Sequence, residues 1–383
     1  MSDVDKLVLE VKGLVTNFYT YEGTVLALDG VDLFLRRGDT MGVVGETGCG
    51  KSVTARSILR LVEPPGRIEE GEILFHKKIL QSGEYETVDL LKLSEAEILE
   101  TRGGSIAIVF QDPATYPNPV FRIGDQIAEV VLLHQDLRRD VLEMKIEELQ
   151  ASLKSAEDTQ KIQIQEKLDY YTSMLDDPPE PDDKDAKKAA MRRAIHMLEM
   201  VRMPAPATIA TQYPHELSGG MRQRALIAMA LACNPAILIC DEATTALDVT
   251  VQAQVLNLLN QLKEEIGTSI MIITHDMGVV AETCNWVNVM YAGTTAESCA
   301  TEELFRTPLH PYTAGLLTAV PKLHETRDRL PQILGTVPNL ITPPTGCRFH
   351  PRCEYATSIC KEERPKLEEL RPGHWVACHN PLE

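Results

Sequence analysis

The chain has 383 residues, of which 44% are hydrophobic and 25% are charged, and its formal net charge at pH 7 is -18. This composition is typical of a folded globular protein with enough apolar material for two domains. An acidic chain binds DNA or RNA poorly, because nucleic-acid phosphates attract clustered Lys and Arg, so nucleic acid is not an expected partner.

The first ten residues alternate charged and apolar side chains and lack the basic and then apolar layout of a secretory signal. No apolar run in the sequence has the length that a membrane-spanning helix requires. We therefore expect no export, and we expect any membrane role to depend on partners that supply the membrane spans.

The predicted elements begin with a small sheet. From residue 7 to residue 35, short stretches alternate apolar and polar side chains, as half-buried antiparallel strands do. The apolar run at 41–44 leads into a glycine loop and a helix that begins near Lys51, which is typical of an α/β core. Further buried strands are predicted at 106–110, 237–240 and 270–273, each followed by polar residues.

The middle and the end of the chain differ in composition from this core. Residues 136–188 are rich in Glu, Lys, Gln and Asp with apolar residues at helical spacing, which predicts a helical hairpin. It closes with DDPPEPDDKD at 176–185, a stretch that cannot continue a helix. After about residue 307 a proline-punctuated segment carries four of the nine cysteines. In a cytosolic chain such a cluster indicates a metal rather than disulfides.

The segment GETGCGKS at 45–52 fits the phosphate-loop pattern between a predicted strand and a predicted helix. Glycines let backbone amides turn toward the phosphates, Lys51 neutralises terminal oxygens, and Ser52 offers its hydroxyl to Mg²⁺. A coincidental glycine turn is the alternative. The candidate ATP-binding residues are Gly45, Glu46, Thr47, Gly48, Cys49, Gly50, Lys51, Ser52 and Val53.

Catalytic candidates follow the other buried strands. Asp241 and Glu242 end one strand, where an acidic residue holds Mg²⁺ and the next carboxylate polarises the attacking water. Gln111 follows another strand and could reach the metal and the water, and His275 is placed to contact the γ-phosphate. Each residue alone could be structural, but together with Lys51 they predict an ATPase site.

The segment LSGGM at 217–221, followed by a predicted helix, resembles the signature sequence of ATP-binding cassette (ABC) proteins. The motif order also matches: phosphate loop, Gln111, signature, Asp241-Glu242, the turn at 246–248, then His275. The resemblance covers about 7–300 and implies an α/β fold. This fold is an ABC nucleotide-binding domain over 1–300, with a RecA-like P-loop core and an antiparallel β subdomain. Its helical subdomain, about 112–225, contains the insertion at 136–188.

In this family two cassettes pack head to tail, so the resemblance implies a site split between two chains. Ser218, Gly219 and Gly220 at a helix N-terminus would bind the ATP held at Lys51 of the other cassette. An aromatic residue stacks on adenine in the family. Tyr21 is the preferred candidate here, ahead of Tyr19 and Phe18.

The segments LFRTPLHPYTAGLL at 304–317 and GCRFHPRC at 346–353 resemble the C-terminal extension of oligopeptide and dipeptide importer ATPases. The resemblance implies an extension over 301–383, peptide cargo, and a second, non-identical ATPase subunit. It also implies two membrane permease subunits, an extracytoplasmic substrate-binding protein, and a place at the cytoplasmic face of the membrane. Oligosaccharides and nickel are the alternative cargoes. A soluble ABC ATPase acting on the ribosome or DNA, and a redox-sensing regulatory subunit, are the alternative functions.

The last four cysteines have the spacing of the members of that group that bind a [4Fe-4S] cluster. They are Cys347, Cys353, Cys360 and Cys378. Four thiolates could equally hold zinc or remain unmetallated, although the pairs two residues apart that are typical of structural zinc are absent from the sequence. The expected role of the cluster is to stabilise an extension that has little core of its own.

Overall fold

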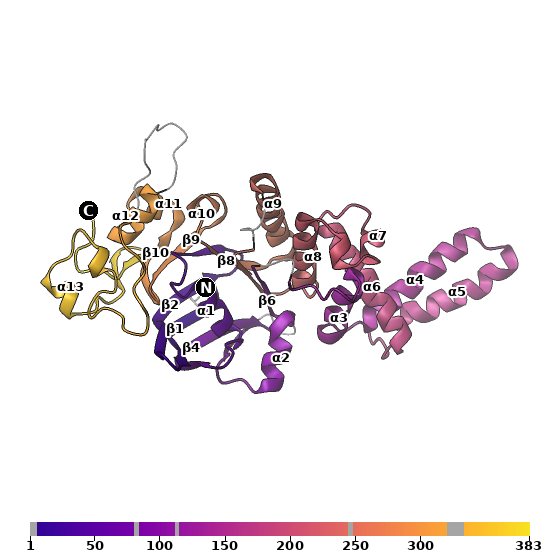
Figure 1. The fold of residues 1–383 in the computed structure, drawn as a ribbon. Helices are drawn as coiled ribbons and strands as arrows, with labels where there is room; N and C mark the ends of the chain where they lie inside the picture. Colours follow the sequence, from indigo (N-terminus) through magenta and orange to yellow (C-terminus); the bar gives the residue numbers. More distant parts are fainter. Residues whose placement is uncertain (1–5, 80–83, 112–114, 244–247, 320–332) are drawn as a thin grey trace. The chain divides into compact units, whose positions relative to one another are not determined.

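The computed structural model describes residues 6–79, 84–111, 115–243, 248–319 and 333–383. The chain divides into two compact units (Figure 1). The first contains Met1–Arg102, Ile106–Gln111 and Ala236–Glu383, and the second contains Gly103–Ser105 and Asp112–Pro235. Within the described ranges, no helix is both long and apolar enough to cross a bilayer.

The first unit is built on an eight-stranded sheet. Its strand order is β11 (Glu368–Arg371), β12 (His374–Val376), β10 (Thr294–Ala300), β9 (Trp286–Tyr291), β3 (Thr40–Val44), β8 (Ser269–Thr274), β7 (Ile237–Asp241) and β6 (Ile106–Val109). The strands from β9 to β6 run parallel, and β9, β10, β12 and β11 pair antiparallel. Every residue of β3, β7 and β8 is buried, as is typical of parallel strands that are covered on both faces. The predicted buried strands are therefore confirmed.

A second sheet, with four antiparallel strands, belongs to the same unit. Its order is β2 (Gly23–Arg36), β1 (Leu7–Thr20), β4 (Gly66–Lys78) and β5 (Tyr85–Asp89). Apolar residues from both sheets meet in one core, which includes Val11, Leu33, Val43 and Ile239. This confirms the antiparallel sheet that the alternating pattern predicts.

Seven α-helices are described in the first unit, in the ranges that the structure covers (Figure 1). They are α1 (Lys51–Ile58), α2 (Glu95–Gly104, whose last two residues lie in the second unit), α9 (Val249–Ile266), α10 (Met277–Thr283), α11 (Thr301–Arg306), α12 (Pro311–Thr318) and α13 (Ser358–Glu362). The helix predicted near Lys51 is confirmed as α1, which begins after Gly50 in a left-handed conformation at φ 101°. A glycine tolerates this backbone conformation at little energetic cost.

The second unit is helical. It contains α3 (Ile123–His134), α4 (Arg138–Ser155), α5 (Asp158–Ser173), α6 (Asp183–Met200), α7 (Pro206–Ala210), η2 (Pro214–Glu216) and α8 (Gly219–Leu231). The insertion forms the predicted hairpin from α4 and α5, and ion pairs fasten α4 to α6, among them Lys145 to Asp185 at 2.5 Å. The acidic proline-rich stretch does contain a helix start, since α6 begins at Asp183 with the Asp182 carboxylate accepting the Asp185 N–H.

The C-terminal extension lies in the first unit. Its strands β11 and β12 continue the main sheet beyond β10, and β10 pairs with β12 at residues 297–299. Between α12 and β11 the described chain forms loops, the short helix α13 and the 3-10 turn η3 (His350–Arg352). The extension is thus joined to the ATPase core through the sheet, and the division at residue 300 stays a prediction.

Candidate active site

The phosphate loop leaves the carboxyl end of β3 and enters α1. Gly45, Gly48 and Gly50 all have positive φ angles, at 152°, 83° and 101°. A Cβ atom at position 45 would meet the Met290 carbonyl oxygen at 2.2 Å. A side chain there would therefore force the loop away from β9. The loop needs glycine for close packing as well as for its turn.

The other loop residues take different places. Thr47 is exposed, whereas Cys49 is completely buried and its Sγ atom faces Gly45. Burial raises the pKa of the Cys49 thiol, which makes the side chain an inert part of the packing. Val53 packs against the hydrophobic core. Of the predicted ATP-binding residues, Cys49 thus has only its backbone to offer to a nucleotide, whereas Val53 is partly exposed.

The predicted phosphate and magnesium ligands lie at the carboxyl ends of β3 and β7. Lys51 donates from Nζ to the carbonyl oxygens of Gly45 at 2.8 Å and Glu46 at 3.1 Å. The Ser52 hydroxyl donates to Oδ1 of Asp241 at 2.8 Å. Burial raises the pKa of Asp241, and the Ser52 hydrogen bond opposes that rise. The buried Asp241 carboxylate at the end of β7 and the Ser52 hydroxyl in the first turn of α1 form a donor set that fits Mg²⁺.

Three predicted catalytic side chains meet at the ends of β6, β7 and β8. Gln111 donates from Nε2 to Oε2 of Glu242 at 2.9 Å, and Nδ1 of His275 lies 3.5 Å from Oε1 of the same carboxylate. The backbone of Glu242 has φ 49°, an uncommon value for a residue with a side chain, and its N–H donates to the Ile273 carbonyl. Adjacent parallel strands thus bring together residues that are 131 positions apart in sequence.

The signature residues lie at the start of α8 in the second unit. Ser218 is the N-cap, and its hydroxyl accepts the Met221 N–H at 3.4 Å. Ser218 and Gly219 are exposed and Gly220 is partly exposed, and a Cβ atom at Gly219 would meet nothing within 4 Å. The helix N-terminus therefore presents N–H groups to open space. Of the predicted turn at 246–248, which follows Glu242, residues 246 and 247 lie outside the described residues, as do 112–114 of the segment after Gln111.

The aromatic candidates for adenine lie around the β1–β2 turn. Tyr21 is 99% exposed, and the Tyr19 hydroxyl donates to Glu69 at 2.9 Å. Phe18 lines a cavity of about 390 Å³ together with Ser52 and Val53 of the phosphate-loop helix. Stacking by Tyr21 stays a prediction, and Phe18 shares a cavity with residues of the predicted nucleotide site.

The four C-terminal cysteines gather around η3 and α13. Asn380 donates its backbone N–H to Sγ of Cys378 and its side-chain N–H to Sγ of Cys360, each at 3.4 Å. Burial, and in addition the neighbouring Cys347, Cys353 and Cys360 thiols, raise the pKa of Cys378 to about 12. The thiols are therefore close enough to repel one another once ionised, and N–H···S bonds to them are typical of thiolate ligands.

The spacing of these sulfurs distinguishes between metal groups. Sulfurs around one tetrahedral zinc ion lie about 4 Å apart, given a Zn–S distance of about 2.3 Å. No three of the four cysteines, all of which are described, bring their sulfurs within 4.8 Å of one another. As they stand, these four sulfurs are therefore not arranged as the ligands of one tetrahedral zinc ion.

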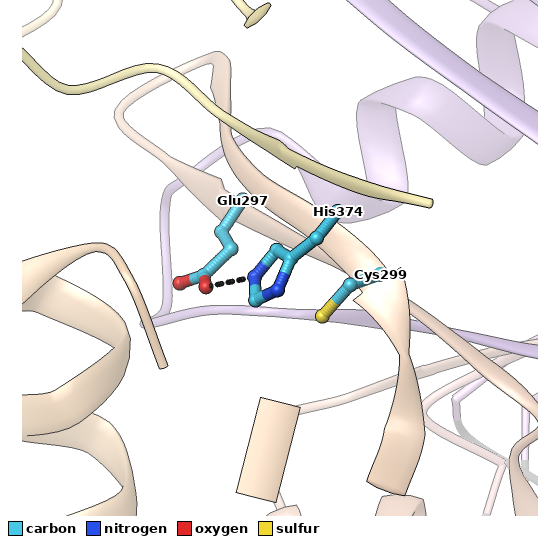
Figure 2. Close-up of side chains that lie close together, drawn as sticks. All are labelled: Glu297, Cys299 and His374. Atoms are coloured by element: carbon cyan, nitrogen blue, oxygen red, sulfur yellow. Dashed lines mark hydrogen bonds and ion pairs between the residues drawn. The ribbon is translucent and has the colours of Figure 1, made fainter. Parts of the chain in front are cut away.

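A further cluster, which the sequence analysis does not single out, lies where the extension joins the sheet. Figure 2 shows the imidazole of His374 on β12 pointing to the carboxylate of Glu297 on β10, with the sulfur of Cys299 beside the same ring. Nε2 of His374 lies 2.6 Å from Oε1 of Glu297. The same Oε1 accepts the Leu309 N–H at 2.7 Å, and Oε2 accepts the His310 N–H at 3.0 Å. All three side chains are buried. The carboxylate therefore fastens β12 and the start of α12 to β10. Residues 77 positions apart give no local signal of this contact.

Comparison with known proteins agrees with this geometry. The ABC transporter family matches residues 28–245, and the oligopeptide/dipeptide transporter C-terminal region matches residues 296–360. The oligopeptide transport ATP-binding protein OppD of Bacillus subtilis is 42% identical over 96% of this chain and 87% of its own length. OppD of Escherichia coli is 40% identical over 98% of this chain and 94% of its own.

The fold is also that of a solved cassette. The dimeric structure of MJ0796, a bacterial ABC transporter cassette, has a TM-score of 0.55 at 22% identity, and the match covers 76% of this chain and 98% of the other. The family match spans more than half of the chain, and full-length relatives exceed 30% identity. The chain therefore belongs to the ABC transporter family, as an ATPase subunit that carries the oligopeptide/dipeptide transporter C-terminal region.

Proposed function

We propose that this ATPase lies at the cytoplasmic face of a membrane and powers the uptake of dipeptides and oligopeptides into the cell. We also propose that Glu242 is its general base. The observation that carries the catalytic assignment is the convergence of Gln111 and His275 on the Glu242 carboxylate. A carboxylate held from two sides can accept a proton from a water molecule without changing its own position.

The chemistry follows from the order of the groups. Lys51, now bonded to two loop carbonyls, would exchange these for phosphate oxygens of ATP. Mg²⁺, which Ser52 and Asp241 would hold, supplies charge neutralisation at the phosphates. Glu242 takes the proton of the attacking water, while Gln111 and His275 orient the carboxylate and the water. ATP is cleaved to ADP and phosphate, and the proton leaves through Glu242.

The site is completed by a second cassette in this proposal. Ser218, Gly219 and Gly220 present anion donors at a helix N-terminus, and the first of these residues is exposed. The solved relative is described as dimeric, which supports the same arrangement for this chain. Closing two cassettes over ATP and releasing them on hydrolysis would supply the mechanical step of transport.

The cargo assignment rests on the C-terminal region and on relatives named for oligopeptide transport. The described chain has no membrane-spanning helix, so permease subunits would form the passage. An extracytoplasmic binding protein would deliver the peptide to them. A second ATPase subunit, different from this chain, would complete the motor.

The test uses the complex purified from membranes through a tag on this chain and reconstituted in proteoliposomes. We expect ATP hydrolysis to rise when peptide and its binding protein are added, and Lys51→Ala to abolish it. Ser218→Arg should block hydrolysis while ATP binding is kept, and Ser152→Arg on exposed α4 is the matched control. Stimulation by a sugar, by nickel or by ribosomes in place of peptide would contradict the cargo assignment.

We also propose that Cys347, Cys353, Cys360 and Cys378 hold a [4Fe-4S] cluster with a structural role. Support comes from the N–H···S bonds of Asn380 and from a sulfur spacing wider than zinc requires. The measurement is the iron, sulfide and zinc content of anaerobically purified protein. We expect four irons and four sulfides per chain, and stoichiometric zinc without sulfide would refute the proposal.

A further inference from the structure

Glu46, the second residue of the phosphate loop, is held by the C-terminal extension. Its carboxylate forms a bidentate ion pair with Arg352: Nη1 donates to Oε2 at 2.6 Å and Nη2 donates to Oε1 at 3.0 Å. The Arg352 side chain is only 5% exposed, whereas that of Glu46 is 31% exposed. Such planar, bidentate pairing fixes direction as well as distance, which a lysine in place of Arg352 could not do.

The backbone of Glu46 is held too. Its N–H donates to the hydroxyl of Tyr312 at 2.9 Å, and its carbonyl accepts from Lys51 Nζ at 3.1 Å and from the Cys49 N–H at 3.3 Å. Tyr312 is fully buried on α12. One residue therefore connects the extension with the lysine that the proposed function places on the ATP phosphates.

Arg352 is itself fixed by its surroundings. Its Nε donates to the Leu334 carbonyl at 2.9 Å, and its guanidinium lies 5.7 Å from the ring centre of Tyr291. Phe349 packs edge-on against Tyr291 with ring centres 5.1 Å apart, and it also packs against Tyr312 at 5.3 Å. Arg352 and Tyr312 therefore both pack against one aromatic cluster that includes Tyr291 and Phe349. Because the packing is close, a displacement of one of these side chains would displace the others.

The turn that carries Arg352 lies between two of the predicted cluster ligands. The His350 N–H donates to the Cys347 carbonyl at 3.0 Å, and the Cys353 N–H donates to the His350 carbonyl at 3.3 Å. Cys353 directly follows Arg352 in the sequence. The position of the guanidinium is therefore tied to the positions of both cysteines.

We propose that Arg352, together with Tyr312, is a positioning residue for the phosphate loop. Through Arg352, a group bound to the four cysteines raises the affinity of the loop for ATP. The inference rests on the proposed ATP site at Lys51. Because a group that binds one conformation of the turn favours the loop conformation attached to it, the coupling is reciprocal, and ATP should also strengthen retention of the group.

The first test is ATP affinity, measured by calorimetry on the full chain. Arg352→Ala should weaken ATP binding about tenfold, the effect of losing a charge-assisted pair. Arg352→Lys should recover only part of this. Arg364→Ala is the matched control, because Arg364 lies in the same extension and pairs with Asp29 at 2.9 Å without contacting the loop.

The second test separates positioning from general destabilisation. Glu46→Gln should weaken ATP binding by a similar factor, and the double variant should bind about as well as either single variant, since the pair acts as a unit. Removing the bound group from the cysteines with a chelator should lower the ATP affinity of the wild type, and it should lower that of Arg352→Ala much less. Additive losses in the double variant, or equal effects of chelation in both proteins, would overturn the inference.

The two hypotheses fail in different ways. If the wild type binds and hydrolyses ATP while Arg352→Ala binds it with unchanged affinity, only the positioning role is wrong. If the wild type does not bind ATP at all, the proposed site at Lys51 is wrong.

Discussion

His310 gives the protein a built-in sensitivity to acid. Its side chain is buried, and burial, opposed in part by the charge of Glu297, lowers its pKa from 6.5 to about 4. The hydrogen bonding agrees, because Nδ1 accepts the Tyr312 N–H at 3.0 Å and can do so only without a proton. The histidine is therefore neutral in the folded protein over most of the pH range in which an unfolded chain would protonate it.

The sign and size of the effect follow by linkage. The unfolded state binds a proton below pH 6.5 and the folded state only below about pH 4, so stability is lost as the pH falls between these values. From pH 7 to pH 5 the loss from this one residue is about 2 kcal/mol, and it approaches about 3 kcal/mol once both states are protonated.

The assay is urea denaturation of the full chain at pH 7 and pH 5, compared with His310→Asn. Asparagine keeps an N-cap acceptor for α12 but cannot be protonated. We expect the variant to lose about 2 kcal/mol less stability between the two pH values than the wild type. His196→Asn, at an exposed position on α6, should behave as the wild type does. Equal pH dependence of all three proteins would refute the assignment of a neutral, buried His310.

Four other substitutions test the sites. Asp241→Asn removes a carboxylate whose burial raises its pKa, so we expect a higher melting temperature without nucleotide, and a loss of magnesium-dependent ATP binding by calorimetry. Tyr21→Ala should weaken ATP binding several-fold, as its predicted stacking on adenine requires. A loss of affinity in Phe18→Ala and none in Tyr21→Ala would assign the stacking to Phe18, which lines the cavity beside Ser52 and Val53. Cys353→Ser should abolish the visible absorption of the proposed iron-sulfur cluster and lower the iron content of the protein. A full cluster in that variant would exclude Cys353 as a ligand.

Local pattern predicted much of the core. The buried strands, the glycine loop and the helix at Lys51 all have short-range signals, namely continuous apolar runs and positive-φ glycines next to them. The placement of Gln111, Glu242 and His275 also followed, because parallel strands deliver their carboxyl ends to one edge of a sheet.

Contacts between distant segments could not be predicted in this way. Nothing near Glu46 indicates that Arg352, 306 positions later, forms an ion pair with it, and nothing near Glu297 indicates His374. The extension was expected to have little core of its own. Two of its strands join the main sheet, a contact that the sequence pattern does not indicate, because strand β10 offers backbone groups to β12.

The order of strands in the main sheet has a consequence for synthesis. β3 emerges early in translation, yet its neighbours β8 and β9 begin at residues 269 and 286, after the entire helical unit has been made. A nascent chain therefore carries a finished phosphate loop on a strand with no partner in its sheet. Because pairing across such a long sequence separation is slow and leaves apolar surface exposed, we expect β3 to remain unpaired in the main sheet until β8 has been synthesised.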